Sequence, residues 1–176
     1  QSPHSWAFNS SSGLFDHDVN KYSDTTYYFL TFSNTGESPK RIITQLSNSS
    51  PNQTVNSFND FQYHEEDNIN LIKSGDTWFG EVFDATTSYN FVFNFPNLVS
   101  GEVLYTKVSA AARSSVQSNY VISSSGSSTN LLLSQVNTSS YTGPFASVND
   151  GSFSFNPSGD LVNLNISYNK PASSSI

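Results

Sequence analysis

The chain has 176 residues, of which 35% are hydrophobic, 14% aromatic and only 12% charged, and its formal net charge is −7. This length suits one domain with a substantial core. The high aromatic and low charged shares exclude an intrinsically disordered chain, which has few aromatic and many charged residues. The acidic balance argues against nucleic acid and anionic lipid as partners, and no apolar run approaches the roughly 20 residues of a membrane-spanning helix.

The first third of the chain contains two segments rich in the aromatic and β-branched residues that strands favour. Thr26–Ser33 and Lys40–Leu46 are predicted as strands, and Asn34-Thr35-Gly36 between them has turn chemistry. The next segment, Glu65–Lys73, carries its acidic residues first and its lysine last, which suits the dipole of a helix. One short helix is therefore predicted here, ending at Gly75.

Alternation of apolar and polar residues marks the strands of the middle of the chain. Trp78–Phe83 is a strand candidate, although it carries aromatic residues on both faces. A longer strand from Glu102 to Arg113 places small and aliphatic residues on one face. Between these two segments, one face of a further strand is wholly aromatic: Tyr89, Phe91, Phe93 and Phe95.

The last third of the chain repeats the alternating pattern. Strands are predicted at Asn119–Ser123, at Asn130–Val136, around Phe153 and Phe155, and from Val162 to Tyr168. The turn pairs Asp150-Gly151 and Gly159-Asp160 flank the Phe153–Phe155 strand, which predicts hairpins at this end. About ten short strands at this spacing predict an all-β fold: an antiparallel β-sandwich, jelly-roll-like, with one short helix.

The expected domain organisation is simple. Residues 1–169 are predicted to form a single β-sandwich domain. The remaining residues, 170–176, have the composition of a linker and predict that a further domain follows.

Two clusters of ionisable residues are candidate metal sites. In a strand, Asp16 and Asp18 share one face while His17 points away, so these three residues converge on an ion only in a loop. His64-Glu65-Glu66-Asp67 is the densest acidic cluster, and its carboxylates offer the oxygen ligands that calcium prefers. The simpler interpretation, which the sequence favours, is that this cluster is the negatively charged start of the predicted helix.

Catalytic signatures are weak. Cysteine is absent, so a thiol nucleophile is excluded, and the Gly-x-Ser-x-Gly turn of a serine hydrolase is absent too. A glycosidase needs two carboxylates facing across a sugar site, and nothing in the sequence pairs Glu65, Glu81, Asp84 or Glu102. Trp6 and Trp78 offer rings on which a sugar stacks, although the aromatics on both faces of Trp78–Phe83 favour a core or an interface.

A series of short motifs resembles a known family. The motifs are, in chain order, Ser2-Pro3-His4-Ser5-Trp6, Tyr22-Ser23-Asp24, Tyr27-Tyr28-Phe29-Leu30, Lys40-Arg41-Ile42, Tyr63-His64-Glu65, residues 74–83 from Ser74 to Phe83, Phe95-Pro96-Asn97 and Ala110-Ala111-Ala112-Arg113. Their order is similar to the region ahead of the peptidase domain in the PorU family, the gingipain-like sortases of the Bacteroidetes type IX (Por) secretion system. The resemblance spans roughly Ser2 to Arg113, and Ser-Gly-x-x-Trp-Phe-Gly-Glu is its most specific part.

The resemblance implies a location and a division of labour. Such sortases sit at the outer-membrane surface of Gram-negative bacteria, cleave the C-terminal sorting signal of exported cargo and attach the cargo to a lipopolysaccharide-type glycan. They use a Cys–His pair, and this chain has no cysteine. The resemblance therefore implies a non-catalytic accessory domain without a cofactor, whose partners are a downstream peptidase domain and secretion-system components or cargo. Asp76 is a departure, because the family pattern has arginine there.

The candidate interface residues for those partners come from the Ser74–Phe83 stretch and from the Tyr63-His64-Glu65 motif: Trp78, Phe79, Glu81, Tyr63 and His64. The simpler alternative is that these five residues close the sandwich core. A second hypothesis for the whole chain is a free-standing carbohydrate- or calcium-binding β-sandwich.

Overall fold

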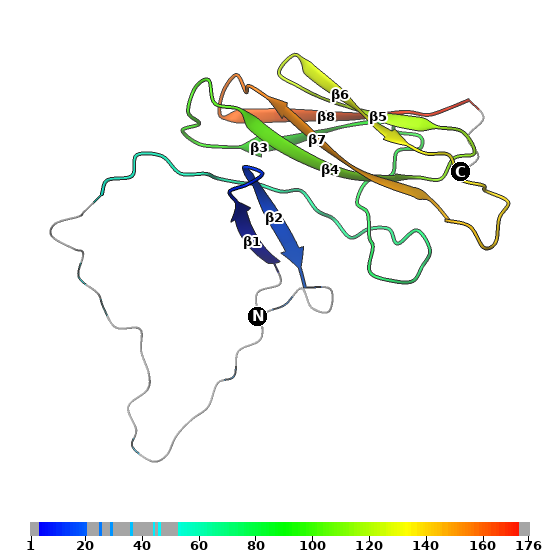
Figure 1. Ribbon diagram of the computed structural model, residues 1–176, viewed down its shortest axis with the longest axis horizontal. Coiled ribbons are helices and arrows are strands. Elements are labelled where there is room, and N and C mark those ends of the chain that lie inside the picture. Colours follow the sequence, from blue (N-terminus) through cyan, green and yellow to red (C-terminus); the bar gives the residue numbers. More distant parts are fainter. Residues whose placement is uncertain are drawn as a thin grey trace. The chain divides into compact units, whose positions relative to one another are not determined.

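The computed structural model describes residues 4–20 and 53–172, together with positions 25, 29, 36, 44 and 46. The predicted strands Thr26–Ser33 and Lys40–Leu46 and the last residues of the predicted tail lie almost wholly outside the described residues. The contacts divide the chain into two compact units, Gln1–Phe61 and Gln62–Ile176 (Figure 1). That residues 1–169 form a single domain stays a prediction.

The first unit contains a hairpin that the sequence analysis did not predict. Strands β1 (His4–Asn9) and β2 (Leu14–Val19) pair antiparallel. Asn9 closes the connection: its carbonyl oxygen accepts a hydrogen bond from the backbone N–H of Gly13 at 2.9 Å, and its side-chain oxygen accepts one from Ser11 at 3.0 Å. Gly13 has a φ of 69°, a conformation that glycine adopts at little cost.

Two features of this hairpin bear on the candidate sites. Asp16 and Asp18 lie inside β2, so the loop conformation that a shared metal site with His17 needs is not present. Trp6 stacks on Phe61 with ring centroids 4.4 Å apart, so one face of its indole ring is covered by another side chain of the same unit.

The second unit consists of two antiparallel sheets that pack face to face (Figure 1). One sheet has the strand order β3-β8-β5-β6, and β4 and β7 form the other. The bounds of these strands are Ser88–Asn94 (β3), Leu104–Ala112 (β4), Ser118–Ser124 (β5), Ser127–Leu133 (β6), Ser147–Phe155 (β7) and Leu161–Asn169 (β8).

The core lies between these two sheets and follows from the period-two pattern of the strands. In β8, the alternate residues Val162, Leu164 and Ile166 are buried, and Ile166 pairs with Ile122 of β5. Phe153 and Phe155 enter from β7 with their rings stacked at 5.2 Å. The other buried hydrophobic residues are Ala110, Tyr120, Leu131 and Leu133.

The predicted all-β antiparallel class is confirmed, and the predicted short helix is wrong. Residues 65–73 form no helix, because the backbone N–H groups of Asn68 and Ile69 donate to the carbonyl oxygen of Phe79 instead. The side-chain oxygen of Asn70 accepts hydrogen bonds from Ile72 and Ser74, a local bond that competes with a helix. Within the described part of the chain, no helix has the length and apolar character needed to cross a membrane.

Three local predictions also differ from the structure. Trp78–Phe83 forms only one isolated bridge, between Phe79 and Ile69. Asp150-Gly151 is no turn but the middle of β7, where a side chain at position 151 would lie 3.0 Å from Leu131. Glycine serves there for a close approach between strands. The predicted terminal hairpins are wrong too, because β7 pairs with β4 and β8 lies in the other sheet.

Tyr120 makes the stability of this fold decrease as the pH rises in the alkaline range. Burial raises the pKa of its phenol, and neighbouring Tyr168 adds to the effect. The folded state thus keeps the proton to a higher pH than the unfolded chain. This contribution to stability is fully present below the unfolded pKa of about 10, and is lost at about 1.4 kcal/mol per pH unit as the pH rises toward the folded pKa.

Tyr120→Phe should remove that part of the pH dependence. At neutral pH, the variant is expected to lose about 1 kcal/mol, because the phenol donates a hydrogen bond to the Ala111 carbonyl oxygen at 3.2 Å. Urea denaturation at about pH 9 and about pH 11 checks both effects. If Tyr120→Phe kept the full alkaline slope of the parent chain, the buried phenol would not be its source.

Candidate functional site

The candidate site is built on two extended segments that precede β3 in the second unit, residues 63–69 and residues 78–83. They meet at the bridge between Ile69 and Phe79, where the backbone N–H of Phe79 donates to the Ile69 carbonyl oxygen at 2.8 Å. The connection between the segments turns at Lys73 and Gly75, both of which have positive φ. Residues before Ile69 therefore lie beside residues after Phe79.

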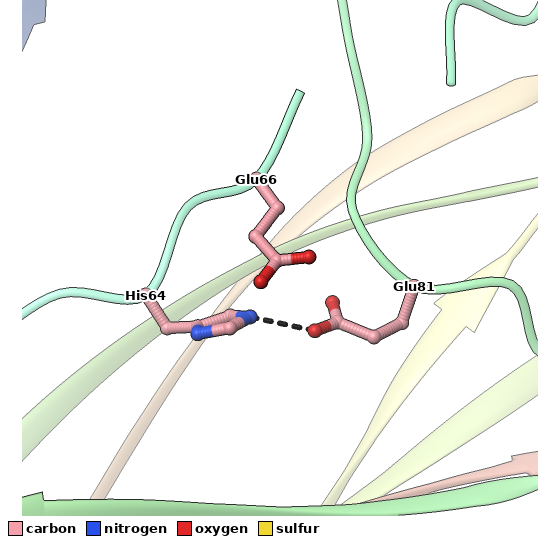
Figure 2. A group of neighbouring side chains, drawn as sticks. All are labelled: His64, Glu66 and Glu81. Atoms are coloured by element: carbon pink, nitrogen blue, oxygen red, sulfur yellow. Dashed lines mark hydrogen bonds and ion pairs between the residues drawn. The ribbon is translucent and has the colours of Figure 1, made fainter. Parts of the chain in front are cut away.

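His64, Glu66 and Glu81 form a cluster across these two segments. The Nε2 atom of His64 lies 2.6 Å from an Oε1 atom of Glu81, and one ligand atom from each of the three residues lies within 4.8 Å of the others. Figure 2 shows the carboxylates of Glu66 and Glu81 converging on the Nε2 side of the imidazole ring. His64 and Glu66 reach the same place because alternate residues of an extended segment share a face.

Neighbouring groups contact His64 and Glu66, and a glycine lets the segment that carries Glu81 approach them. The ring of Phe91 packs against the His64 ring at a centroid distance of 4.8 Å. The side-chain amide of Asn68 donates to Oε2 of Glu66 at 2.7 Å. Gly80 lets the second segment come close, because a Cβ atom at that position would lie 3.3 Å from the Glu66 carbonyl oxygen, tighter than ordinary contact.

The cluster is open to solvent on one side. The side chain of His64 is 37% exposed and that of Glu81 is 23% exposed. An ion pair with this exposure adds little to stability, about 1 kcal/mol or less. Stabilisation of the fold therefore does not explain why these three ionisable side chains converge.

The five predicted interface residues all lie on the two segments, with different surroundings. His64 and Glu81 are brought together as described. Tyr63 and Trp78 are about half exposed, at 49% and 48%. Phe79 is partly buried and supplies the backbone of the bridge. None of the five residues belongs to the buried core cluster, and their role as interface residues stays a prediction.

Trp78 also lines an open depression in the connection between the segments. Its other lining residues are Asn68, Ile69, Asn70, Lys73, Ser74 and Gly75. Among the carboxylates considered for a glycosidase pair, Asp84 forms an ion pair with Lys170 instead. The sequence analysis did not single out Glu66 as a partner of His64 and Glu81. The alternation of His64 and Glu66 was the available signal, but it was interpreted as the start of a helix.

Comparison with known proteins finds a similar solved structure but no matching family model or curated protein. The solved structures include a similar one, the crystal structure of dimeric latent PorU from Porphyromonas gingivalis, with a TM-score of 0.65. The resemblance to PorU is confirmed at the level of the fold. The match covers 98% of this chain at 18% identity, but only 17% of the PorU chain.

Proposed function

We propose that this chain is a non-catalytic accessory β domain of a PorU-type sortase. In this role it supports or positions a gingipain-like cysteine peptidase domain and its cargo at the outer-membrane surface of a Gram-negative bacterium. The observation that carries the proposal is the likeness to PorU over 98% of this chain. Because that likeness covers 17% of the PorU chain, it relates this chain to one part of a larger protein.

The composition of the chain supports the non-catalytic part of the proposal. Its sequence has no cysteine, so the thiolate of a cysteine peptidase would come from another domain or another chain. What the chain offers a partner is surface, and its half-exposed aromatic residues Tyr63 and Trp78 lie on the segments around the bridge. Large aromatic side chains of this kind commonly dominate the binding free energy of protein interfaces.

A pull-down with the whole chain as bait tests the proposal. The prey is the solubilised outer-membrane fraction of a bacterium with a type IX secretion system, and bound proteins are identified by mass spectrometry. We expect recovery of a gingipain-like cysteine peptidase or of cargo that carries a C-terminal sorting signal. Trp78→Ala should lower that recovery by about 10-fold or more, because it removes a half-exposed ring from the proposed contact surface.

Tyr141→Ala is the matched control, because this ring is fully exposed and lies outside the two segments. It should recover as much peptidase or cargo as the parent chain. Recovery of neither class of protein would contradict the accessory role. Binding of the chain to a glycan array would then favour the free-standing carbohydrate-binding module.

A further inference from the structure

We propose that His64, Glu66 and Glu81 bind one divalent transition-metal ion of the Zn²⁺ class. The proposal does not depend on the accessory role. It begins with the identity of the three groups, since imidazole nitrogen and carboxylate oxygen are both ligands that zinc takes in proteins. Figure 2 shows the three side chains turned toward one point from two separate segments.

The spacing of the ligand atoms suits an ion of this size. Zinc binds nitrogen and carboxylate oxygen at about 2.0–2.2 Å, so its ligand atoms lie roughly 3.3–3.6 Å from one another. In the cluster, His64 Nε2 and Glu81 Oε1 are 2.6 Å apart, and one ligand atom from each of the three residues lies within 4.8 Å of the others. Small side-chain rotations reach the required spacing. The ion then takes the place of the proton between His64 and Glu81.

Charge favours a cation at this point. Two carboxylates that converge on one imidazole repel each other, and a chain with a net charge of −7 supplies few positive groups to offset them. Lys73 is the nearest cation along the two segments, and it lies in the turn beyond the Ile69–Phe79 bridge. A divalent ion would neutralise both carboxylates while leaving the imidazole uncharged.

The groups around the cluster hold the ligands as the surroundings of a metal site do. Asn68 donates a hydrogen bond to Glu66, and the ring of Phe91 packs against His64. Outer groups that fix the orientation of metal ligands commonly change metal affinity by about 10- to 100-fold when removed. Gly80 contributes by allowing the segment with Glu81 to approach Glu66.

The ligand set selects among metals. Calcium takes six to eight oxygen ligands and does not favour an imidazole, whereas this cluster has two carboxylates and one imidazole. Three protein ligands leave a fourth position of a tetrahedral ion open to water or to a partner's side chain. Such an ion would also tie the segment before the bridge to the segment after it.

Isothermal titration calorimetry tests the proposal. The whole chain is first freed of metal by a chelator and is then titrated with Zn²⁺. We expect one ion bound at this site. Glu81→Gln keeps the size of the side chain and should weaken binding more than about 100-fold, as should His64→Ala. Asn68→Ala should weaken it by about 10-fold. Glu102→Gln is the matched control, an exposed carboxylate outside the cluster, and should bind as the parent chain does.

Several outcomes would overturn the proposal. One is a parent chain that takes up no Zn²⁺ while circular dichroism shows it folded. Another is Glu81→Gln binding Zn²⁺ as tightly as Glu102→Gln, which would move the ion to other residues of the chain. Tighter binding of Ca²⁺ than of Zn²⁺ in the same titration would refute the metal class.

Discussion

Replacing Ile122 by alanine is expected to lower the free energy of unfolding of the second unit by about 3–4 kcal/mol. Ile122 has no exposed surface, and β5, on which it lies, pairs with β6 on one side and β8 on the other. Its neighbour across the ladder is Ile166, which is also buried. The truncation removes apolar contact area and leaves a cavity between sheets that cannot close around it.

Urea denaturation followed by tryptophan fluorescence and circular dichroism measures this loss. Trp78 belongs to the second unit, and Trp6 belongs to the first, so Trp6→Phe in both parent and variant isolates the signal. Val92→Ala is the control, since Val92 is 59% exposed on β3 and its loss should change stability by about 0.5 kcal/mol or less. Equal losses from Ile122→Ala and Val92→Ala would contradict the core described for this unit.

Replacing Arg113 by lysine is expected to lower stability by about 2 kcal/mol. The guanidinium donates hydrogen bonds to the carbonyl oxygens of Phe145 at 2.6 Å and Thr138 at 2.7 Å. It also lies 4.2 Å from the centre of the Phe145 ring. Arg113 follows the end of β4, so it fastens the long connection between β6 and β7 to that strand. A single ammonium group does not reproduce the planar fork that reaches both carbonyls.

A double-mutant cycle with Phe145→Ala separates the ring contact from the two hydrogen bonds. The coupling between Arg113 and Phe145 should be about 0.5–1 kcal/mol, the size of a cation–π contact near solvent. Gln117→Ala, an exposed position nearby, is the control and should leave stability unchanged within about 0.5 kcal/mol. If Arg113→Lys were as stable as this control, the connection would be held by other contacts, such as the bond from the Val136 N–H to the Ser114 carbonyl.

Strands whose alternation is strict were predicted from the sequence close to their actual bounds. Val162, Leu164 and Ile166 were assigned to one face of a strand, and β8 buries all three. The Phe91 and Phe93 face of β3 followed from the same pattern. Strands β5 and β6 overlap the segments predicted at Asn119–Ser123 and Asn130–Val136, and the turn between them has positive φ at Ser125 and Gly126.

The candidate site was only partly predictable. The residues His64 and Glu81 were selected for an interface, but nothing in the sequence showed that they are in contact, because 17 positions separate them. Glu66 was assigned to the wrong secondary structure for a physical reason. A charge that suits a helix dipole contributes only about 0.3–1 kcal/mol, and the hydrogen bonds of Asn68 and Ile69 to Phe79 outweigh it.

The sequence by itself determined the all-β class and the buried faces of β3, β4, β7 and β8, since both depend on local alternation and turn residues. Only the tertiary structure decided which strands pair, because β7 with β4 and β8 with β3 and β5 are long-range choices made by burial. Glycine is needed at position 151 because Leu131 of another strand lies close to it, and at position 80 because the backbone of Glu66 does. The cluster of His64, Glu66 and Glu81 likewise exists only because the two segments around the bridge lie side by side.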